Sequence, residues 1–238
     1  MQKIKRGSKV AEELAQDILR KVCAEGATPG SRLPSEATMV AEYGVGRGSL
    51  REALRILEIH GIIRIKAGPG GGPVVVGPTT TDFGRMATMF FQAGAMTFRE
   101  VIDARLLLEP MIARMAAERR EPELVEQLLA AETSTSSDAA YLKTSANFHW
   151  QVGSMSGNRI LNLMSHALED IFHARVVGML FPPERREAVV EAHHAIAEAI
   201  ARGDADAAER LMREHMVEYA RYVEQRHPAL IDEIVEWH

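Results

Sequence analysis

The stretch LPSEATMVAEYGVGRGSLREALRILEIHGIIRIKAGPGGGPVVV, residues 33–76, decides how the first part of the chain folds. It begins with two short helices joined by a tight turn. Ser35 stands where a helix-capping residue is expected, and the first of these helices ends at Gly44. The second helix begins near Gly46 or Arg47 and ends at Gly61.

The second of these helices has one apolar face and one polar face. Its apolar residues recur with the spacing of a helix face that packs on a core: Leu50, Ala53, Leu54 and Leu57. The opposite face presents Arg47, Ser49 and Arg51 near the start of the helix. This face can contact an anion, although exposed arginines usually remain solvated.

A helix before this stretch and a hairpin at its end complete the pattern. Residues 10–24 carry an apolar stripe with helical spacing, and residues 62–66 alternate like a half-buried strand. Residues 68–72 (GPGGG) suit a hairpin tip, and residues 74–76 suit the returning strand. Three helices and a hairpin in this order form a winged helix-turn-helix, whose third helix enters the major groove of DNA. The sequence therefore predicts a DNA-binding domain over residues 1–78.

The remainder of the chain, residues 79–238, is expected to form only helices. Segments with helical apolar spacing alternate with Gly, Pro, Ser or Asp breaks. The expected helices are residues 83–94, 97–118, 122–132, 138–155, 158–180, 183–202 and 204–225, with a short helix after Pro228. The predicted fold class is mainly α, with an N-terminal winged helix-turn-helix and a C-terminal all-helical bundle of six or seven helices.

The composition suits a DNA-binding protein in a reducing compartment. Residues 1–72 hold 12 Lys and Arg against 8 Asp and Glu, whereas the remainder holds 16 against 25. A basic end on an acidic body fits a protein that places one end on a polyanion. No apolar run approaches the roughly 20 residues of a membrane span, and the N-terminus lacks the apolar core of a secretory signal. The single cysteine, Cys23, excludes an intrachain disulfide, so we expect a cytoplasmic protein with no membrane partner.

About 65 residues of the N-terminal part resemble the DNA-binding domain of GntR-type regulators. The motifs that carry the likeness are PGSRLPSE, GVGRGSLREALRILEIHG and KAGPGGG. The resemblance implies that Arg47 and Arg51 contact a double-stranded DNA operator. It also implies that Gly48 and Ser49 lie along the DNA backbone and that Gly68 belongs to the wing.

Two residues depart from the family pattern. Ala37 stands where many relatives have an arginine that contacts DNA. Gly46 replaces the usual serine cap of the recognition helix, at a cost of about a few tenths of a kcal/mol. We expect these departures to alter sequence preference or affinity rather than to abolish binding. Arg55, further along the same helix, either contacts DNA or remains solvated.

Three histidines of the helical part converge in the expected fold: His149, His193 and His215. The break at residues 203–204 is so short that the helices on either side should run antiparallel. His193 and His215 would each lie roughly 15–17 Å from this break at about 1.5 Å per residue, so they can face each other. His149 lies in a helix that can pack against them. The cluster is either a set of ordinary core histidines or a site for a transition metal.

The helical part resembles the effector domain of the FadR-like branch of this family, which is of the FCD type. The matching segments are SANFH (residues 145–149), AHHAI (192–196) and MREH (212–215). The resemblance implies that His149, His193 and His215 bind a divalent transition metal, Zn²⁺ or Ni²⁺. The family's fourth ligand is an aspartate, and Ser145 stands in its place. Because a serine hydroxyl carries no charge, the site would bind metal more weakly, use water in place of the carboxylate, or stay empty.

Arg105, within EVIDARLLLEP (residues 100–110), matches an arginine of the same family. The resemblance implies that it binds an effector carboxylate together with the three histidines. A guanidinium beside a metal suits this role, since a carboxylate can be held by both. The alternative is a salt bridge on the helix surface with Asp103 or Glu109.

Four further polar residues are less decisive. Asn158 matches a family asparagine and suits a helix cap. His166 and His173 either line the same cavity or face a partner subunit. His194 lies about 100° around the helix from His193 and should point elsewhere.

Together these features predict a homodimeric, metabolite-responsive transcription regulator. The resemblance favours a repressor that leaves its operator when a small organic or sugar acid binds. A metal-dependent hydrolase with a DNA-binding appendage is one alternative, but Ser145 removes its most convenient general base, so we do not expect an enzyme. A DNA-binding dimer without an effector is another.

Overall fold

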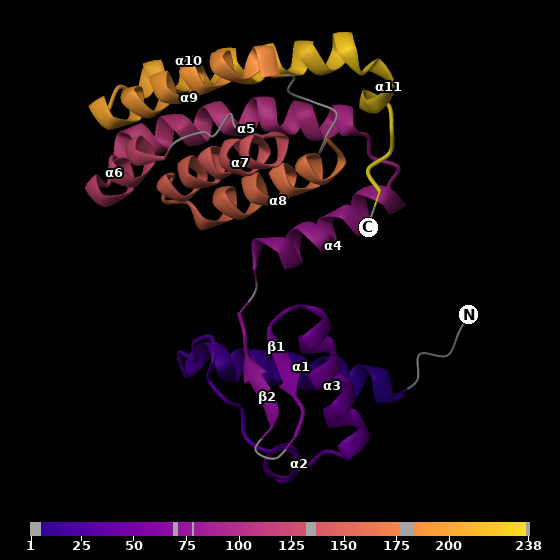
Figure 1. Cartoon of the computed structure of the whole chain (residues 1–238). Coiled ribbons are helices and arrows are strands. Elements are labelled where there is room, and N and C mark those ends of the chain that lie inside the picture. Colours follow the sequence, from indigo (N-terminus) through magenta and orange to yellow (C-terminus); the bar gives the residue numbers. More distant parts are fainter. Residues whose placement is uncertain (1–5, 69–70, 78, 132–136, 177–182, 237–238) are drawn as a thin grey trace. The chain divides into compact units, whose positions relative to one another are not determined.

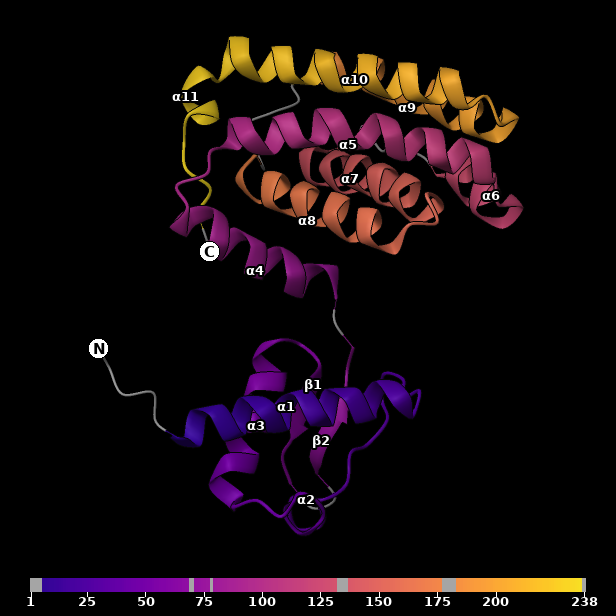
Figure 2. The ribbon, with the colours of Figure 1, turned by 180° about the vertical axis from the view of Figure 1, so that it is seen from behind.

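The computed structural model describes residues 6–68, 71–77, 79–131, 137–176 and 183–236. It divides into two compact units, Met1–Asp82 and Phe83–His238, which are visible in Figures 1 and 2. Each unit has its own buried core. Within the described residues, no helix is both long enough and apolar enough to cross a membrane.

The N-terminal unit contains three helices and a hairpin. Its elements are α1 (Arg6–Ala24), α2 (Glu36–Tyr43), α3 (Arg47–Ile59), β1 (Ile63–Lys66) and β2 (Gly72–Val75). The two strands are antiparallel, with Ile63 opposite Val75. The predicted apolar face of α3 is fully buried and packs on α1. The winged helix-turn-helix expected from the sequence is therefore confirmed.

The turn between α2 and α3 has the predicted start and stop signals. The Ser35 side chain accepts a hydrogen bond of 3.2 Å from the backbone N–H of Thr38. Gly44 ends α2 with a φ of 63°, a left-handed conformation that glycine adopts without strain. Gly46 precedes α3 without a side-chain cap, as expected for a residue that has no side chain.

The hairpin tip is shorter than predicted, because Gly72 already belongs to β2. Residues 69–70 of the predicted tip lie outside the described residues. Gly68 has a φ of 93° and its carbonyl accepts from the N–H of Gly71 at 2.9 Å. A Cβ at Gly71 would lie 2.3 Å from the carbonyl oxygen of Lys66, so only glycine fits there.

Helix α4 (Thr80–Ala93) begins before residue 83, where the sequence prediction placed its start. The reason is a pair of reciprocal hydrogen bonds. The N–H of Asp82 donates to Oγ1 of Thr79 at 3.1 Å, while the N–H of Thr79 donates to Oδ2 of Asp82 at 3.1 Å. This capping box starts the helix three residues earlier than the apolar spacing suggested. Packing accordingly divides the chain after Asp82 rather than near Thr79.

The described residues of the C-terminal unit form helices joined by short connections. After α4 come α5 (Phe98–Arg119), α6 (Pro122–Ala130), α7 (Asp138–Met155), α8 (Arg159–Val176), α9 (Pro183–Arg202), α10 (Ala205–Arg226) and α11 (Pro228–Ile231). The long helix α5 lies between the α9–α10 pair and the α7–α8 pair, as Figures 1 and 2 show from opposite sides. The predicted all-helical bundle is confirmed. The predicted helical residues 177–180 lie outside the described residues.

Candidate DNA interface and metal centre

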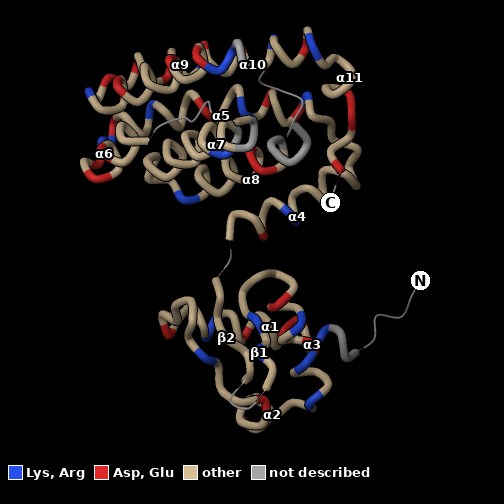
Figure 3. The backbone as a smooth tube through the Cα atoms, in the orientation of Figure 1, with Lys and Arg blue, Asp and Glu red and all other residues tan. Residues whose placement is uncertain are grey.

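Helix α3 presents a polar face at its N-terminal end. Arg47 and Gly48 are exposed and Ser49 is half-buried. Arg51 is also exposed, and its Nε donates to Oε2 of Glu36 on α2 at 3.0 Å. The basic residues of α3 are drawn with those of the rest of the chain in Figure 3. The sequence pattern located this face but missed the carboxylate that holds Arg51.

The hairpin and α2 add two further exposed positions of interest. Gly68 is exposed at the end of β1, and Ala37 is exposed on α2. The sequence predicted Gly68 as part of the wing, and it does lie in the loop between the two strands. The methyl group of Ala37 offers no hydrogen bond, so α2 lacks a polar group at this position.

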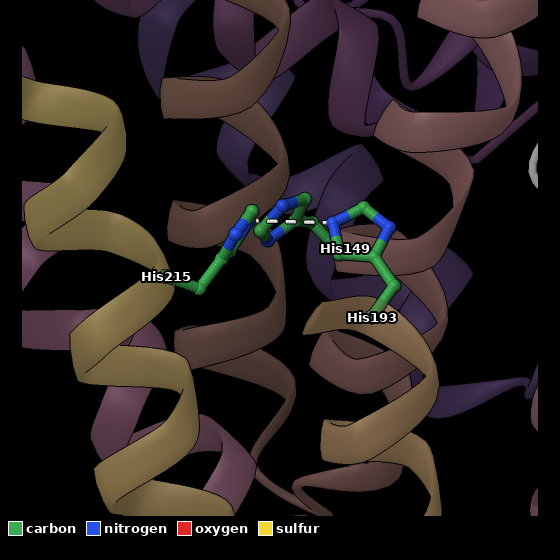
Figure 4. A group of neighbouring side chains, drawn as sticks. All are labelled: His149, His193 and His215. Carbon is green, nitrogen blue, oxygen red and sulfur yellow. Dashed lines mark hydrogen bonds between the residues drawn. The ribbon is translucent and has the colours of Figure 1, made fainter. Parts of the chain in front are cut away.

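The three predicted histidines come together in the C-terminal unit. His149 comes from α7, His193 from α9 and His215 from α10, and their rings point toward one another in Figure 4. One ring nitrogen from each lies within 4.8 Å of the other two. The Nε2 atoms of His193 and His215 are 3.3 Å apart. The antiparallel α9–α10 hairpin brings these two residues opposite each other, as the positions of the break and the histidines suggested.

Burial keeps two of the imidazoles neutral. It lowers the pKa of His193 well below its usual value, and the neighbouring His215 and His149 lower it further. Burial likewise lowers the pKa of His215 to about 3. The His193 ring stacks on Phe148 with a centroid distance of 4.0 Å, which fixes its plane. Neutral, oriented imidazoles are the form that binds a transition metal.

A buried carboxylate, Glu109 of α5, contacts the cluster. Its Oε2 lies 2.9 Å from Nδ1 of His149, and only 1% of Glu109 is exposed. A carboxylate accepts a hydrogen bond here, so Nδ1 carries the proton and Nε2 of His149 is left as the ligand atom. Burial alone would raise the pKa of Glu109, but the contacts with His149 and Arg105 hold it at about 2.

Arg105 is buried and paired with two carboxylates. Its Nε and Nη2 donate to Oε1 of Glu109 at 3.3 and 3.2 Å, and it also forms an ion pair with Glu169 of α8. The sequence left open a salt bridge of Arg105 with Asp103 or Glu109 on the helix surface. The salt bridge with Glu109 does form, but it lies in the core rather than on the surface, and Asp103 is exposed.

A network of buried charged groups borders the histidines. Arg105 pairs with Glu109 and Glu169, and Glu109 contacts His149. His193 and His215 stay neutral. Three imidazole ligands beside a buried carboxylate form a suitable donor set for Zn²⁺ or Ni²⁺.

Ser145 lies one turn before His149 on α7 and is half-buried. A serine hydroxyl is uncharged, so Ser145 brings no charge to the cluster. The negative charge next to the histidines comes from α5 instead, through Glu109.

Two of the other histidines face away from the cluster. Nε2 of His166 lies 3.2 Å from the carbonyl oxygen of Trp150, and the two rings stack. His194 is exposed and lies 3.6 Å from Glu198. The side chain of His173 lies outside the described residues.

Asn158 caps helix α8. Its Oδ1 accepts hydrogen bonds from the backbone N–H groups of Ile160 at 3.0 Å and Leu161 at 3.2 Å. This is the capping role that the sequence suggested for it.

Comparison with known proteins assigns both units. The family described as bacterial regulatory proteins, gntR family, matches residues 7–72, and the FCD domain matches residues 100–218. The chain belongs to the GntR family and carries an FCD domain. The function of a metabolite-responsive, DNA-binding transcription regulator, predicted from the sequence, is thereby confirmed.

Full-length relatives agree with this assignment. The HTH-type transcriptional repressor NanR of Enterobacter sp. (strain 638) is 33% identical, over 87% of this chain and 81% of that protein. NanR of Escherichia coli (strain K12) is 31% identical, over 87% and 80% respectively. Because these relatives are transcription regulators, the alternative of a metal-dependent hydrolase gains no support from them.

A solved structure supports the fold as a whole. The Streptococcus agalactiae GntR structure superposes with a TM-score of 0.71 and 22% identity, covering 89% of this chain and 99% of that one. At this identity the likeness shows the arrangement of the helices and strands, not the ligand.

Proposed function

We propose that the chain is a homodimeric transcriptional repressor that leaves its operator when a small carboxylate binds beside a metal in the FCD domain. Residues 1–78 would bind DNA, and residues 79–238 would bind the effector and the second subunit. The observation that carries this proposal is the cluster of His149, His193 and His215, with the buried carboxylate of Glu109 behind His149.

In the DNA-binding unit we assign the operator contacts to the exposed face of α3. Arg47 and Arg51 would donate to base edges or phosphates in the major groove, since both lie in the first half of the helix. Gly48 and Ser49 would lie against the DNA backbone, where a small residue allows close approach. Gly68 would do the same from the wing. Two copies of α3 would bind the half-sites of a near-palindromic operator.

In the effector-binding unit we assign Zn²⁺ or Ni²⁺ to the three histidines. His149 would use Nε2, because its Nδ1 faces Glu109. His193 and His215 would also use Nε2, the atoms that already face each other. When bound, the metal would supply a Lewis-acidic site for a carboxylate.

The ligands of the proposed metal explain why a carboxylate is the expected effector group. A divalent cation held by three imidazoles would keep its positive charge and an open coordination position. The carboxylate of an organic or sugar acid would suit that position. Arg105 would help to hold it, since a guanidinium can share carboxylates in a bidentate manner. The bound acid can weaken DNA binding only if it favours one arrangement of the two DNA-binding units over the other.

The experiment is a pair of measurements on the purified full-length protein. Electrophoretic mobility shifts on DNA from the region upstream of its own gene should show a specific complex. A thermal-shift screen of organic and sugar acids, with and without Zn²⁺ or Ni²⁺, should find an acid whose effect needs metal and which releases the DNA. Specific DNA binding without any metal or acid effect would support the alternative of a dimer that takes no effector.

A further inference from the structure

A groove between α9 and α10 leads from the protein surface to the histidine cluster. It encloses about 430 Å³, part of which is open to solvent. Its walls are formed by Ala188, Val189 and Ala192 of α9 and by Tyr219 and Tyr222 of α10. His215 also lines it.

His215 connects the groove to the proposed metal site. Within the cluster, His149 and His193 are buried, whereas His215 is half-buried. A ligand that approaches along the groove therefore meets His215 first. Its Nε2 is directed at His193, so the inner end of the groove lies next to the atoms assigned to the metal.

The walls of the groove are chiefly apolar and aromatic. Of the lining residues, Arg185 and Glu218 carry charge, and they form an ion pair with each other. The guanidinium of Arg185 also lies 4.6 Å from the centre of the Tyr222 ring. Methyl groups and aromatic faces gain from contact with a flat apolar body, whereas they leave hydroxyl groups without hydrogen-bond partners.

We propose that this groove holds the body of the effector, and that the effector is therefore a carboxylate with an apolar or aromatic body rather than a polyhydroxylated sugar acid. This inference rests on the proposed function, because it places the carboxylate at the metal. The ring or chain would extend outward between Val189 and Tyr222. The family resemblance allows any small organic or sugar acid as effector, and this inference restricts the effector to acids with an apolar or aromatic body.

The test is isothermal titration of the full-length, Zn²⁺-loaded protein with benzoate, phenylacetate and gluconate. Benzoate or phenylacetate should bind at least tenfold more tightly than gluconate, and only when zinc is present. Equal or tighter binding of gluconate overturns the inference but leaves the proposed function intact. If none of the three acids binds the zinc-loaded protein, the inference is likewise overturned, whereas the proposed function fails only if the protein shows no specific DNA binding.

Substitutions in the groove locate the binding site. Ala192→Phe should fill the inner groove and lower the affinity for the aromatic acid about tenfold or more. Ala201→Phe, on the same helix but outside the groove, should not. Ala201→Phe should also leave Zn²⁺ affinity and DNA binding unchanged. If Ala192→Phe disturbs the fold, Val189→Thr adds a hydroxyl to the wall at nearly constant shape. Unchanged affinity for benzoate and phenylacetate in the well-folded variants would place the effector elsewhere.

Discussion

At the scale of single residues, Glu109 is the side chain that joins the histidine cluster to the buried charges. One carboxylate oxygen faces Nδ1 of His149 and the other accepts from Arg105. A carboxylate behind a histidine ligand fixes both the tautomer and the plane of its ring. Glu109 should therefore affect metal binding without contacting the metal itself.

Replacing Glu109 tests this role. Glu109→Ala should weaken Zn²⁺ binding about 10–100-fold, because His149 loses the partner that orients it. Glu109→Gln should recover part of the loss, since its amide oxygen can still accept from Nδ1. Affinity is measured by competition with a chromophoric chelator. Glu118→Gln, an exposed change on the same helix, serves as the control. Equal Zn²⁺ affinities in the wild type and Glu109→Ala would contradict the assignment.

Ser145 gives a second test at this scale. Ser145→Asp places a carboxylate one turn before His149, where the family pattern has its fourth ligand. We expect Zn²⁺ affinity to rise about tenfold or more, because an anionic oxygen ligand replaces a neutral hydroxyl. In the metal-free protein the same change should lower the midpoint of urea unfolding, since it places a negative charge at a half-buried position without a bound cation. A variant with unchanged affinity would show that residue 145 does not reach the metal.

The two residues also show what the sequence could and could not predict. The departure at Ser145 is visible in the motif SANFH, because its spacing to His149 is fixed by the helix. The role of Glu109 is not visible. An Arg and a Glu four residues apart look the same on a solvated face as in a core, and it is the packing of α7, α8 and α10 against α5 that buries this pair.

At the scale of elements, α2 and α3 together set the position of Arg51. Its ion pair with Glu36 is exposed, with 69% and 39% of the two side chains accessible. Such surface pairs contribute only about 0–1 kcal/mol, so a DNA phosphate or base can take the place of Glu36. The pair would hold the guanidinium near its DNA-bound position in the free protein.

Arg51→Ala should therefore weaken operator binding by about tenfold or more, the loss expected for one charge-assisted base or phosphate contact. Fluorescence anisotropy with a labelled operator, repeated over a range of salt concentrations, measures both the loss and the change in salt dependence. Arg20→Ala, a change of an exposed arginine on α1, is the matched control. If both variants bound as tightly as the wild type, the operator contact would have to be reassigned to other residues of α3.

The ends of helices were predictable where a strong local sequence signal has no competing signal beside it. The Ser35 cap, the Gly44 turn and the apolar face of α3 appear in the structure as the sequence predicted. The start of α4 did not, because its capping box at Thr79 and Asp82 lies in a Pro/Thr stretch that reads as a linker. The Pro and Thr residues favour a linker, whereas the reciprocal hydrogen bonds of Thr79 and Asp82 favour the start of a helix. Both signals are local, and the helix forms.

At the scale of the whole molecule, the C-terminal unit leaves an apolar surface uncovered on α5 and α8. Leu107 is 72% exposed and Ile160 is 69% exposed. Met111 and Met164, one turn further along each helix, are also exposed. Exposed apolar side chains that form such a patch mark an interaction surface.

The charges at the two ends of this surface suggest how it pairs. Helix α8 runs antiparallel to α5, since Glu169 contacts Arg105 and Ile160 borders the same surface notch as Met115. One end of the surface therefore carries Asp103, and the other carries Arg159. A second copy related by a two-fold axis would place the acidic end of one subunit against the basic end of the other. Such a self-complementary pattern fits the proposed homodimer.

The corresponding prediction is that Leu107→Lys combined with Ile160→Lys shifts the protein from dimer to monomer. Four buried lysines of like charge, two from each subunit, would meet across the two-fold axis, and burying unpaired charges is strongly unfavourable. Light scattering coupled to gel filtration measures the mass of the wild type and the variant. Leu129→Lys, a change of an exposed leucine on α6, should remain dimeric. The monomeric variant should also bind a two-half-site operator more weakly while keeping its affinity for a single half-site, because only the second, linked contact is lost. A double variant that remained dimeric would exclude this face as the subunit interface.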